Sequence, residues 1–419
     1  MLAVLRRRDF SLLWLSGLVS VAGDWVLMIA LPYYVYVTTG STLATAGMTA
    51  AELAPAILLS SFTGVLADRW DRKRILVVAN LLQALVVASL LLVGEGWLWV
   101  VYVVAALQST AAAFSQPAEA ALLPTLVPVE QLVQANALNT LNNRLGRFVG
   151  VPVGAALLSW WGLDAVVVVD AVTFLVAAAL LAPISAPVRV ADPDDEPEEP
   201  HFWREWTAGL RVVRRDRTIA VLFVVFGLMT FGGTMLDPLY VPWIRDVLDE
   251  GVEVVAVVTM THSVAGIVGS LLVGTWGSRF SARTLMGWGS VIAGVLLLVK
   301  FNVPVLWLTL ALSAIGGATA VASSVGVETL AQERTPEHVR GRVFGSLQAF
   351  IWLASLLGAV VGGVLGELTS VLVAINVAAG LVTGAGVVVL LAIPAARERP
   401  APRGRTPARG RRRRAASRR

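Results

Sequence analysis

Four carboxyl groups interrupt long apolar segments of this sequence, and such groups can do proton chemistry. A carboxyl group removed from water can take up and release a proton, or bind a cationic ligand. Asp24 is the first candidate for proton coupling or substrate binding, because it lies half-way along its apolar segment with no cation one helical turn away. Glu52, Asp170 and Asp237 are further candidates. The alternative for each is a structural role, as an acid hydrogen-bonded to a neighbouring helix or solvated near the end of its segment.

The sequence predicts that these acids lie in membrane-crossing helices. Of its 419 residues, 57% are hydrophobic and only 15% are charged, whereas soluble domains have about 25% charged residues. A helix needs about 20 apolar residues to cross a bilayer, and continuous rather than alternating runs exclude a transmembrane β-barrel. We predict an all-α membrane protein with 12 transmembrane helices in two six-helix halves. The runs cover residues 10–38, 43–67, 75–94, 97–116, 141–161, 164–183, 219–241, 254–276, 285–301, 305–327, 343–365 and 371–393.

The basic residues predict how these helices are oriented. Of the 33 Lys and Arg residues, 31 lie before the first run, in every second connection or after the last run, and only Arg245 and Lys300 lie elsewhere. This count assigns Arg144 and Arg147, which stand near the start of the fifth run, to the connection between the fourth and fifth runs. Because cytoplasmic loops are enriched in Lys and Arg, both termini are expected in the cytoplasm. The excess of Arg over Lys is typical of a GC-rich bacterial genome, so we predict a multi-pass protein of the bacterial plasma (inner) membrane.

The chain divides into two halves around its longest connection. Residues 186–217 begin as an acidic, Pro-rich linker and end in a short amphipathic segment. They separate an N-terminal half, 1–185, from a C-terminal half, 218–396. The remaining tail, 397–419, contains eleven Arg and one Glu, and we expect it to be disordered. Its expected partner is the anionic inner leaflet of the bilayer, where each cation gains about 1 kcal/mol, and no nucleic-acid partner is expected.

An internal repeat supports this division. Residues 64–74, GVLADRWDRKR, match residues 274–285, GTWGSRFSARTL, at an offset of 210. A second match pairs Gly150 with Gly358 at an offset of 208. Six runs in each half give both halves the same orientation, so the sequence predicts a parallel repeat about an axis along the membrane normal.

The segment GVLADRWDRKR resembles the signature G-x-L-A-D-R-x-x-R-K of the major facilitator superfamily (MFS), which lies between spans 2 and 3. Span number, orientation and repeat extend the resemblance to nearly the whole chain. It implies the MFS fold and a latch that holds the two halves together on the cytoplasmic side when the cavity faces outward, with a partner near Arg342 and Gly345. The alternative is plain topology, in which the basic residues are simply retained in the cytoplasm. The latch candidates are Gly64, Asp68, Arg69, Arg72 and Lys73.

Two further segments are similar to the drug:proton antiporter branch of this superfamily, which includes macrolide-efflux proteins and the enterobactin exporter. Residues 114–138 carry the first similarity. Span 5 carries the second in RLGRFVGVPVGAALL, which resembles the span 5 signature of exporters but has its proline shifted and one glycine fewer. This motif has two interpretations, a closely packed helix interface or an export-specific hinge. Its residues are Gly146, Gly150, Pro152 and Gly154.

The resemblance also implies a central cavity lined by spans 1, 4, 7 and 10. Met and aromatic side chains suit bulky apolar ligands because they adapt in shape. The same residue types are also ordinary components of membrane helices, which is the alternative for each of them. The candidates are Met28, Gln108, Phe114, Met229, Phe231 and Met235.

The sequence predicts neither an enzyme nor a primary pump. It has no cysteine, three widely separated His residues and no G-x-x-x-x-G-K-[ST] segment, so no metal site, cofactor or ATP site is expected. We predict a secondary active transporter, a monomer by resemblance, that exports hydrophobic or amphipathic small molecules such as drugs or macrolides in exchange for protons by alternating access. Two alternatives stay open: an exporter or flippase with a narrow substrate, such as a siderophore or a lysophospholipid, and a non-transporting membrane receptor or scaffold.

Overall fold

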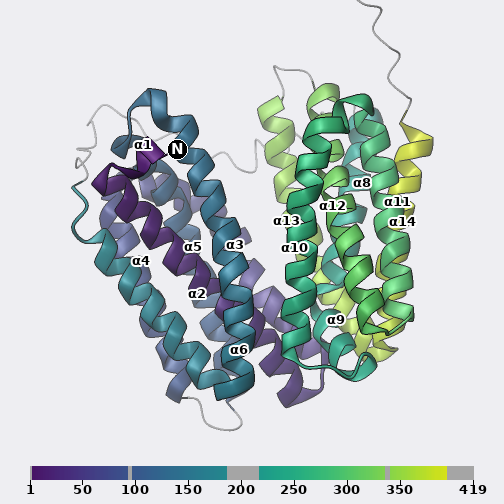
Figure 1. The fold of residues 1–419 in the computed structure, drawn as a ribbon, viewed down its shortest axis with the longest axis horizontal. Coiled ribbons are helices and arrows are strands. Elements are labelled where there is room, and N and C mark those ends of the chain that lie inside the picture. The colour runs from purple at the N-terminus through teal and green to yellow at the C-terminus, as the bar shows by residue number, and fades with distance from the viewer. Residues whose placement is uncertain (1, 93–96, 186–216, 336–339, 394–419) are drawn as a thin grey trace, which may run out of the picture.

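The computed structural model describes residues 2–92, 97–185, 217–335 and 340–393, and every element within these ranges is a helix (Figure 1). The tail and nearly all of the predicted linker lie outside the described residues. The N-terminal half contains α1 (Leu2–Leu5), α2 (Arg8–Thr39), α3 (Thr42–Arg69), α4 (Arg72–Ala88) with η1 (Ser89–Leu92), α5 (Leu98–Leu126), η2 (Val129–Gln131) and α6 (Leu132–Leu181). The C-terminal half contains α8 (Arg217–Met235), α9 (Asp237–Pro242), η3 (Trp243–Val247), α10 (Val252–Trp276), η4 (Gly277–Arg279), α11 (Ala282–Asn302), α12 (Leu306–Arg334), α13 (Arg340–Leu368) and α14 (Val371–Ala392).

Helix α6 contains two membrane spans. Eleven helical segments of the described residues are long and apolar enough to cross a membrane. One of them is α6, whose 50 residues would extend about 75 Å as a straight helix, more than twice the thickness of the hydrocarbon core. The chain turns inside α6 at Gly162, where φ is 77° and ψ is −172°. A positive φ favours glycine, and the turn divides α6 into two spans. The predicted 12-helix fold is therefore confirmed.

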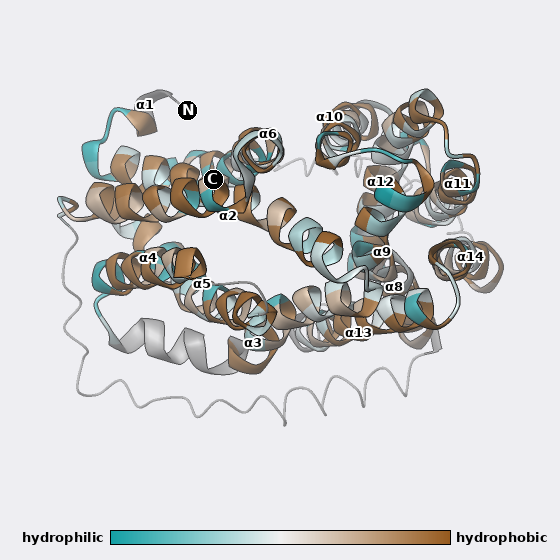
Figure 2. Ribbon diagram, turned by 90° about the horizontal axis from the view of Figure 1, so that it is seen from below, coloured by the Kyte–Doolittle hydropathy of each residue, from teal (hydrophilic) through white to brown (hydrophobic). Residues whose placement is uncertain are grey.

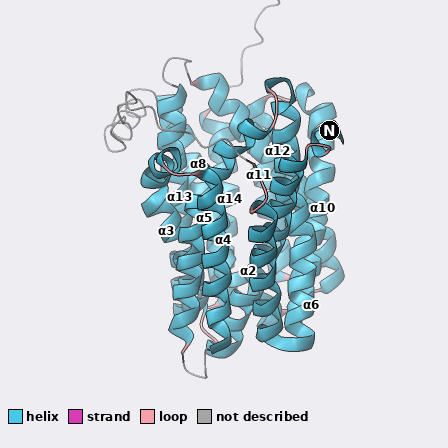
Figure 3. Cartoon of the chain, turned by 90° about the vertical axis from the view of Figure 1, so that its left-hand side faces the viewer, coloured by secondary structure: helices cyan, strands magenta, loops and turns pink. Residues whose placement is uncertain are grey.

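The two halves meet at one end of the bundle. Figure 1 shows them diverging toward the end that carries the N-terminus, and Figure 3 shows the helices running along a common axis. We call this the basic end, because α2 begins there at Arg8 and α4 at Arg72, and we call the opposite end the closed end. Seen from the closed end in Figure 2, α3 lies beside α13 and α6 beside α10. The halves thus contact each other mainly through these two helix pairs, and α9 also contacts α2 and α3.

The two halves begin their third spans in the same way. Helix α4 begins after Asp71, whose side chain accepts a hydrogen bond from the Arg74 N–H at 3.1 Å. Helix α11 begins after Ser281, whose Oγ accepts from the Thr284 N–H at 3.2 Å. Asp71 and Ser281 are 210 positions apart, which is the offset of the first sequence match. Both residues satisfy an N–H at a helix start that otherwise has no partner.

Glycines pack the fifth span of each half against the first. A Cβ atom placed on Gly154 of α6 would lie 2.6 Å from the Val26 carbonyl oxygen and 2.8 Å from Val26 Cα of α2. A Cβ atom on Gly362 of α13 would lie 2.8 Å from Met235 Cα of α8. Each glycine therefore allows two backbones to approach more closely than any side chain permits. Gly154 and Gly362 are 208 positions apart, so the second sequence match also has a common structural role.

Gly154→Ala is expected to destabilise the N-terminal half, because the new methyl group overlaps the backbone of α2 rather than a flexible side chain. The expected loss is about 1–3 kcal/mol, the usual cost of overpacking. Thermal unfolding of the purified protein in detergent measures it as a lowered midpoint. Gly384→Ala in α14 is the matched control, since nothing lies within 4 Å of its Cβ position. Equal midpoints for the two variants would contradict close packing as the role of Gly154.

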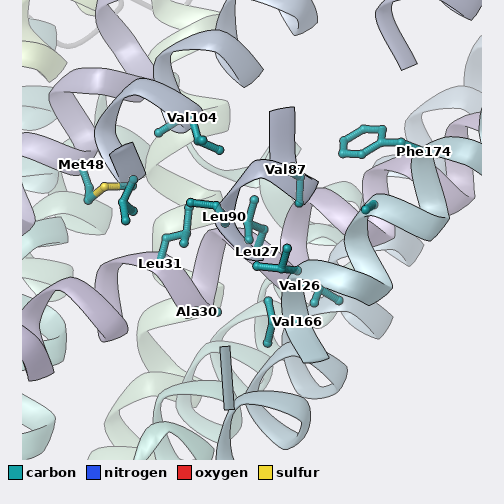
Figure 4. Packing of buried hydrophobic residues seen from close by; sticks show 14 of the residues in the cluster. Val26, Leu27, Ala30, Leu31, Met48, Val87, Leu90, Val104, Val166 and Phe174 are labelled. Carbon is teal, nitrogen blue, oxygen red and sulfur yellow. The ribbon is translucent and has the colours of Figure 1, made fainter. Parts of the chain in front are cut away.

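Helix α2 is anchored by the core of the N-terminal half and turns its other face to the junction. Val26, Leu27, Ala30 and Leu31 of α2 are buried in one apolar cluster with residues of α3, α4, α5 and α6. Figure 4 shows Leu27 and Leu31 beside Leu90. This burial fixes the rotation of α2 about its axis. As a consequence Trp25 and Met28 point toward the C-terminal half.

Candidate functional site

A cavity of about 380 Å³ lies between the two halves near the closed end. Helices α2, α3 and α6 line it from the N-terminal half, and α9, α10 and α11 line it from the C-terminal half. Its size lies in the range of sites for small organic molecules. Besides Tyr240, five of its lining residues are ionisable: Glu52, Arg147, Asp237, His262 and Lys300.

Two carboxyl groups, which we call the acidic pair, face the cavity from opposite halves. Glu52 lies on α3, and its backbone carbonyl accepts a hydrogen bond from Ser109 Oγ at 2.5 Å. Asp237 begins α9, two residues after α8 ends at Met235, and the following Pro238 has no N–H to continue the α8 ladder. The two carboxyl groups lie within electrostatic range of each other. Among the described side chains, none forms an ion pair with either, so both are available to protons or to a cationic ligand.

Three nitrogen-bearing side chains, which we call the basic cluster, face the same cavity. Arg147 lies on α6 with its guanidinium carbon 4.6 Å from the centre of the Trp25 ring. His262 lies on α10, and Lys300 lies on α11. Both Lys300 and Arg147 are within electrostatic range of the His262 ring. The cavity therefore holds groups of both signs, contributed by both halves.

Asp24 and Asp170 form a second, separate acid pair. Asp24 is exposed and lies one turn before Met28 on the same face of α2, outside the lining of the cavity. Asp170 is completely buried in the second part of α6, and its Oδ2 atom has no hydrogen-bond partner. Thr173 Oγ1 lies 3.4 Å from the other carboxylate oxygen. The structure thus brings Glu52 and Asp237 together and places the two remaining candidates elsewhere.

The predicted cavity residues are distributed over several places. Of the six, Met28 borders this cavity. Phe114 borders a separate groove between α4 and α5, and Met235 is buried against Gly362. Spans 4 and 10 contribute no residue to the lining, because the halves approach each other through α3, α13, α6 and α10. The other candidates lie on α5 and α8 outside the lining: Gln108, Met229 and Phe231.

Three sets of hydrogen bonds, which we call the closing contacts, join the halves at the closed end. In each set a hydroxyl group of the N-terminal half donates to a carboxylate of the C-terminal half. Ser41 Oγ donates to Glu367 Oε2 at 2.9 Å, and the Thr42 N–H donates to the same oxygen at 3.0 Å. The other two sets join Tyr36 to Asp246 and Ser159 to Glu253. These contacts close the cavity on the side away from the basic end.

Glu367→Ala is expected to weaken this closure, because it removes the acceptor that Ser41, Thr42 and Leu43 share at the start of α3. The contact is exposed, so the expected change is about 1 kcal/mol or less, up to roughly a fivefold shift toward the state open at this end. Spin labels at Asp164→Cys and Val303→Cys report the separation of the halves, and the chain has no native cysteine. Glu130→Ala, at an exposed acid in η2, is the control. Identical distance distributions for the two variants would contradict the role of Glu367.

The predicted latch lies at the basic end. Arg72 Nη1 donates to the Ala121 carbonyl of α5 at 2.8 Å, within its own half, and Lys73 is half-buried. No heavy atom lies within 4 Å of the Cβ position of Gly345, near the expected partner. The other positions lie outside the described side chains: Gly64, Asp68, Arg69 and Arg342.

A family model described as transmembrane secretion effector matches residues 1–410. The chain belongs to this family of the major facilitator superfamily. Macrolide efflux protein A of Streptococcus pyogenes is 28% identical over 366 residues, which cover 85% of this chain and 89% of that protein. Enterobactin exporter EntS of Citrobacter koseri is 26% identical over 396 residues, which cover 91% and 89%. This MFS transporter therefore has relatives of the efflux type.

Solved structures agree with the MFS fold. The nucleoside transporter NupG aligns with a TM-score of 0.75 at 12% identity, over 91% of this chain and 98% of that chain. A bacterial homologue of the iron transporter ferroportin aligns with a TM-score of 0.72 at 17% identity, over 91% and 98%. At such identities the likeness extends to the fold and not to the substrate.

The basic cluster of this MFS chain was not predicted as a site. Arg147 is a correction, because the sequence count assigns it to a connection whereas the structure places it inside α6, which begins at Leu132. His262 was not singled out by any motif. Lys300 gave one signal: it is one of two cations outside the basic segments of the sequence.

Proposed function

We propose that this chain exports hydrophobic or amphipathic small molecules in exchange for protons. The observation that carries this proposal is the cavity between the halves, which receives a carboxyl group from each half. Protons and a cationic group of the substrate can therefore compete for one place that both halves share. The relatives named as macrolide efflux protein and enterobactin exporter favour export. A proton gradient would supply the free energy without a cofactor.

Alternating access would use two arrangements of the halves. In the first, the closing contacts are made and substrate enters from the basic end, which we propose to face the cytoplasm with both termini. Substrate then displaces protons from Glu52 and Asp237. In the second, the closing contacts break and the latch forms, so substrate leaves outward and protons take its place. Proton flow is coupled to export only if the protein converts readily between the two arrangements when it carries protons or substrate. The protein that carries neither must not convert readily.

A narrow-substrate exporter is the second candidate function. The similarity to an enterobactin exporter favours a siderophore as its substrate. Both candidates would use the same cavity and differ in how many ligands it accepts.

Drug susceptibility of a bacterial strain that lacks its own efflux pumps distinguishes the two. Expression of the chain is expected to protect this strain against several unrelated amphipathic compounds from a panel of macrolides, fluoroquinolones and cationic dyes. Protection against none of them, together with siderophore release, would favour the narrow exporter. Flat susceptibility and no siderophore release at good expression would contradict export by either route.

A further inference from the structure

Lys300 is a buried cation without an anionic partner among the described residues. The residue is 8% exposed. Its Nζ atom lies 4.9 Å from the centre of the Phe301 ring and 5.1 Å from that of Tyr240. Aromatic faces attract a cation but accept none of its three N–H donors in a conventional hydrogen bond. A charge buried within membrane spans is costly and is expected to face a cavity or a partner, and Lys300 faces the cavity.

Arg147 repeats this arrangement in the other half. Its guanidinium group lies over the Trp25 ring, and its Nε atom is buried without a hydrogen-bond partner. His262 lies within electrostatic range of both Arg147 and Lys300. Three side chains from α6, α10 and α11 thus converge on one part of the cavity with donors that no described carboxylate receives.

The acidic pair lies in the same cavity but does not neutralise the basic cluster. Among the described residues, no oxygen of Glu52 or Asp237 lies within 4.0 Å of a nitrogen of Lys300, Arg147 or His262. The cavity therefore has a negative and a positive region without an ion pair between them, and apolar, aromatic and threonine side chains make up the rest of its lining. A neutral ligand would satisfy neither region, and a purely cationic ligand would leave the basic cluster unpaired.

Resting on the proposed function, we propose that the substrates are zwitterionic amphiphiles whose carboxylate or phosphate is bound by Lys300. Arg147 adds positive charge beside that group, and the cationic group of the substrate takes the place of a proton at the acidic pair. An ammonium group is a compact donor suited to either anion. A cavity of about 380 Å³ admits a small aromatic zwitterion or the headgroup of a zwitterionic lysophospholipid.

Binding of norfloxacin to the purified full-length protein tests this, because its derivatives lack one charge each. Norfloxacin is a fluorescent zwitterion with a carboxylate and a protonated piperazine. Its methyl ester lacks the anion, and its N-acetyl derivative lacks the cation. We expect the wild-type protein to bind norfloxacin about tenfold or more tightly than either derivative, as for loss of a hydrogen bond to a charged group.

Variants then assign each charge to its region. Lys300→Met is expected to weaken norfloxacin binding about tenfold and to leave the affinity for the methyl ester unchanged. Lys300→Arg keeps the charge and should restore most of the affinity. Glu52→Gln should weaken binding of norfloxacin and its ester but not of the N-acetyl derivative. Unchanged binding of the methyl ester shows that Lys300→Met is folded, and unchanged binding of the N-acetyl derivative shows that Glu52→Gln is folded.

Lysophosphatidylcholine below its micellar concentration distinguishes the two sources of such a ligand. If lysophosphatidylcholine displaces norfloxacin at lipid concentrations below the Kd of norfloxacin, the site prefers a lipid headgroup. If the lipid displaces norfloxacin only at higher concentrations or not at all, the site prefers a free zwitterion. The proposal is overturned if the ester binds as tightly as norfloxacin, if Lys300→Met weakens both equally, or if neither zwitterion binds saturably. In those cases the protein would still export other compounds in exchange for protons. Only loss of that export would contradict the proposed function itself.

Discussion

Glu52→Gln combined with Asp237→Asn is expected to abolish proton-driven transport while substrate exchange at saturating concentration persists. The two amides keep the size of the side chains but cannot release a proton, and these are the carboxyl groups that face the cavity from opposite halves. In proteoliposomes, a gradient of one pH unit sustains up to about a tenfold concentration ratio for each proton exchanged. We expect the wild-type protein to build such a ratio for an exported compound of the panel and the double variant to build none.

Two single variants sharpen this result. Asp164→Asn changes an exposed acid near the turn in α6 and should leave coupling intact. Asp24→Asn tests the other acid pair, which lies outside the cavity. If Asp24→Asn abolishes the response to pH and the double variant retains it, coupling belongs to Asp24 and Asp170 instead.

Gly363→Leu is expected to slow transport strongly by hindering closure. A Cβ atom on Gly363 of α13 would lie 2.9 Å from the Thr42 carbonyl oxygen of α3, in the opposite half, and Thr42 Oγ1 donates to the Gly363 carbonyl at 2.8 Å. A leucine must push the halves apart at the closed end. Overpacking of about 1–3 kcal/mol shifts the balance between the two arrangements by roughly 5- to 150-fold. Transport should fall by a comparable factor, because the cycle needs the closed arrangement.

The control for this variant is Gly380→Leu on α14, where nothing lies within 4 Å of the Cβ position. Spin labels at Asp164→Cys and Val303→Cys should report a wider separation for Gly363→Leu and an unchanged one for Gly380→Leu. Wild-type transport and unchanged distances in Gly363→Leu would show that contact between α3 and α13 is not required for the cycle.

The fold could be predicted because bilayer thickness sets the length of an apolar run. Only α6 joins two predicted runs in one helix, and Gly162 separates them two residues before Asp164. The repeat could be detected in the sequence because equivalent positions in the two halves have the same structural role, which restricts the residue types that fit there. Asp71 and Ser281 cap equivalent helices, and Gly154 and Gly362 allow equivalent close approaches.

The site could be predicted only in part, because a cavity depends on which helix faces converge. Glu52 and Asp237 were candidates because acids are rare in apolar runs, but nothing in the sequence showed that they face each other. Arg147 was missed because the charge count assigned it to a cytoplasmic connection, although it lies within the fifth apolar run and inside α6, which begins at Leu132. Contacts such as that of Glu367 with Ser41 join residues 326 positions apart, beyond any local pattern.

Proton release on substrate binding tests the central claim most directly, that protons and substrate compete for the acidic pair in the cavity between the halves. Purified protein in weakly buffered solution is mixed with an exported compound of the panel while the pH is recorded. The account predicts release of protons from the wild-type protein and none from the variant with Glu52→Gln and Asp237→Asn at saturating ligand. No release from the wild-type protein, or equal release from the double variant, would contradict it.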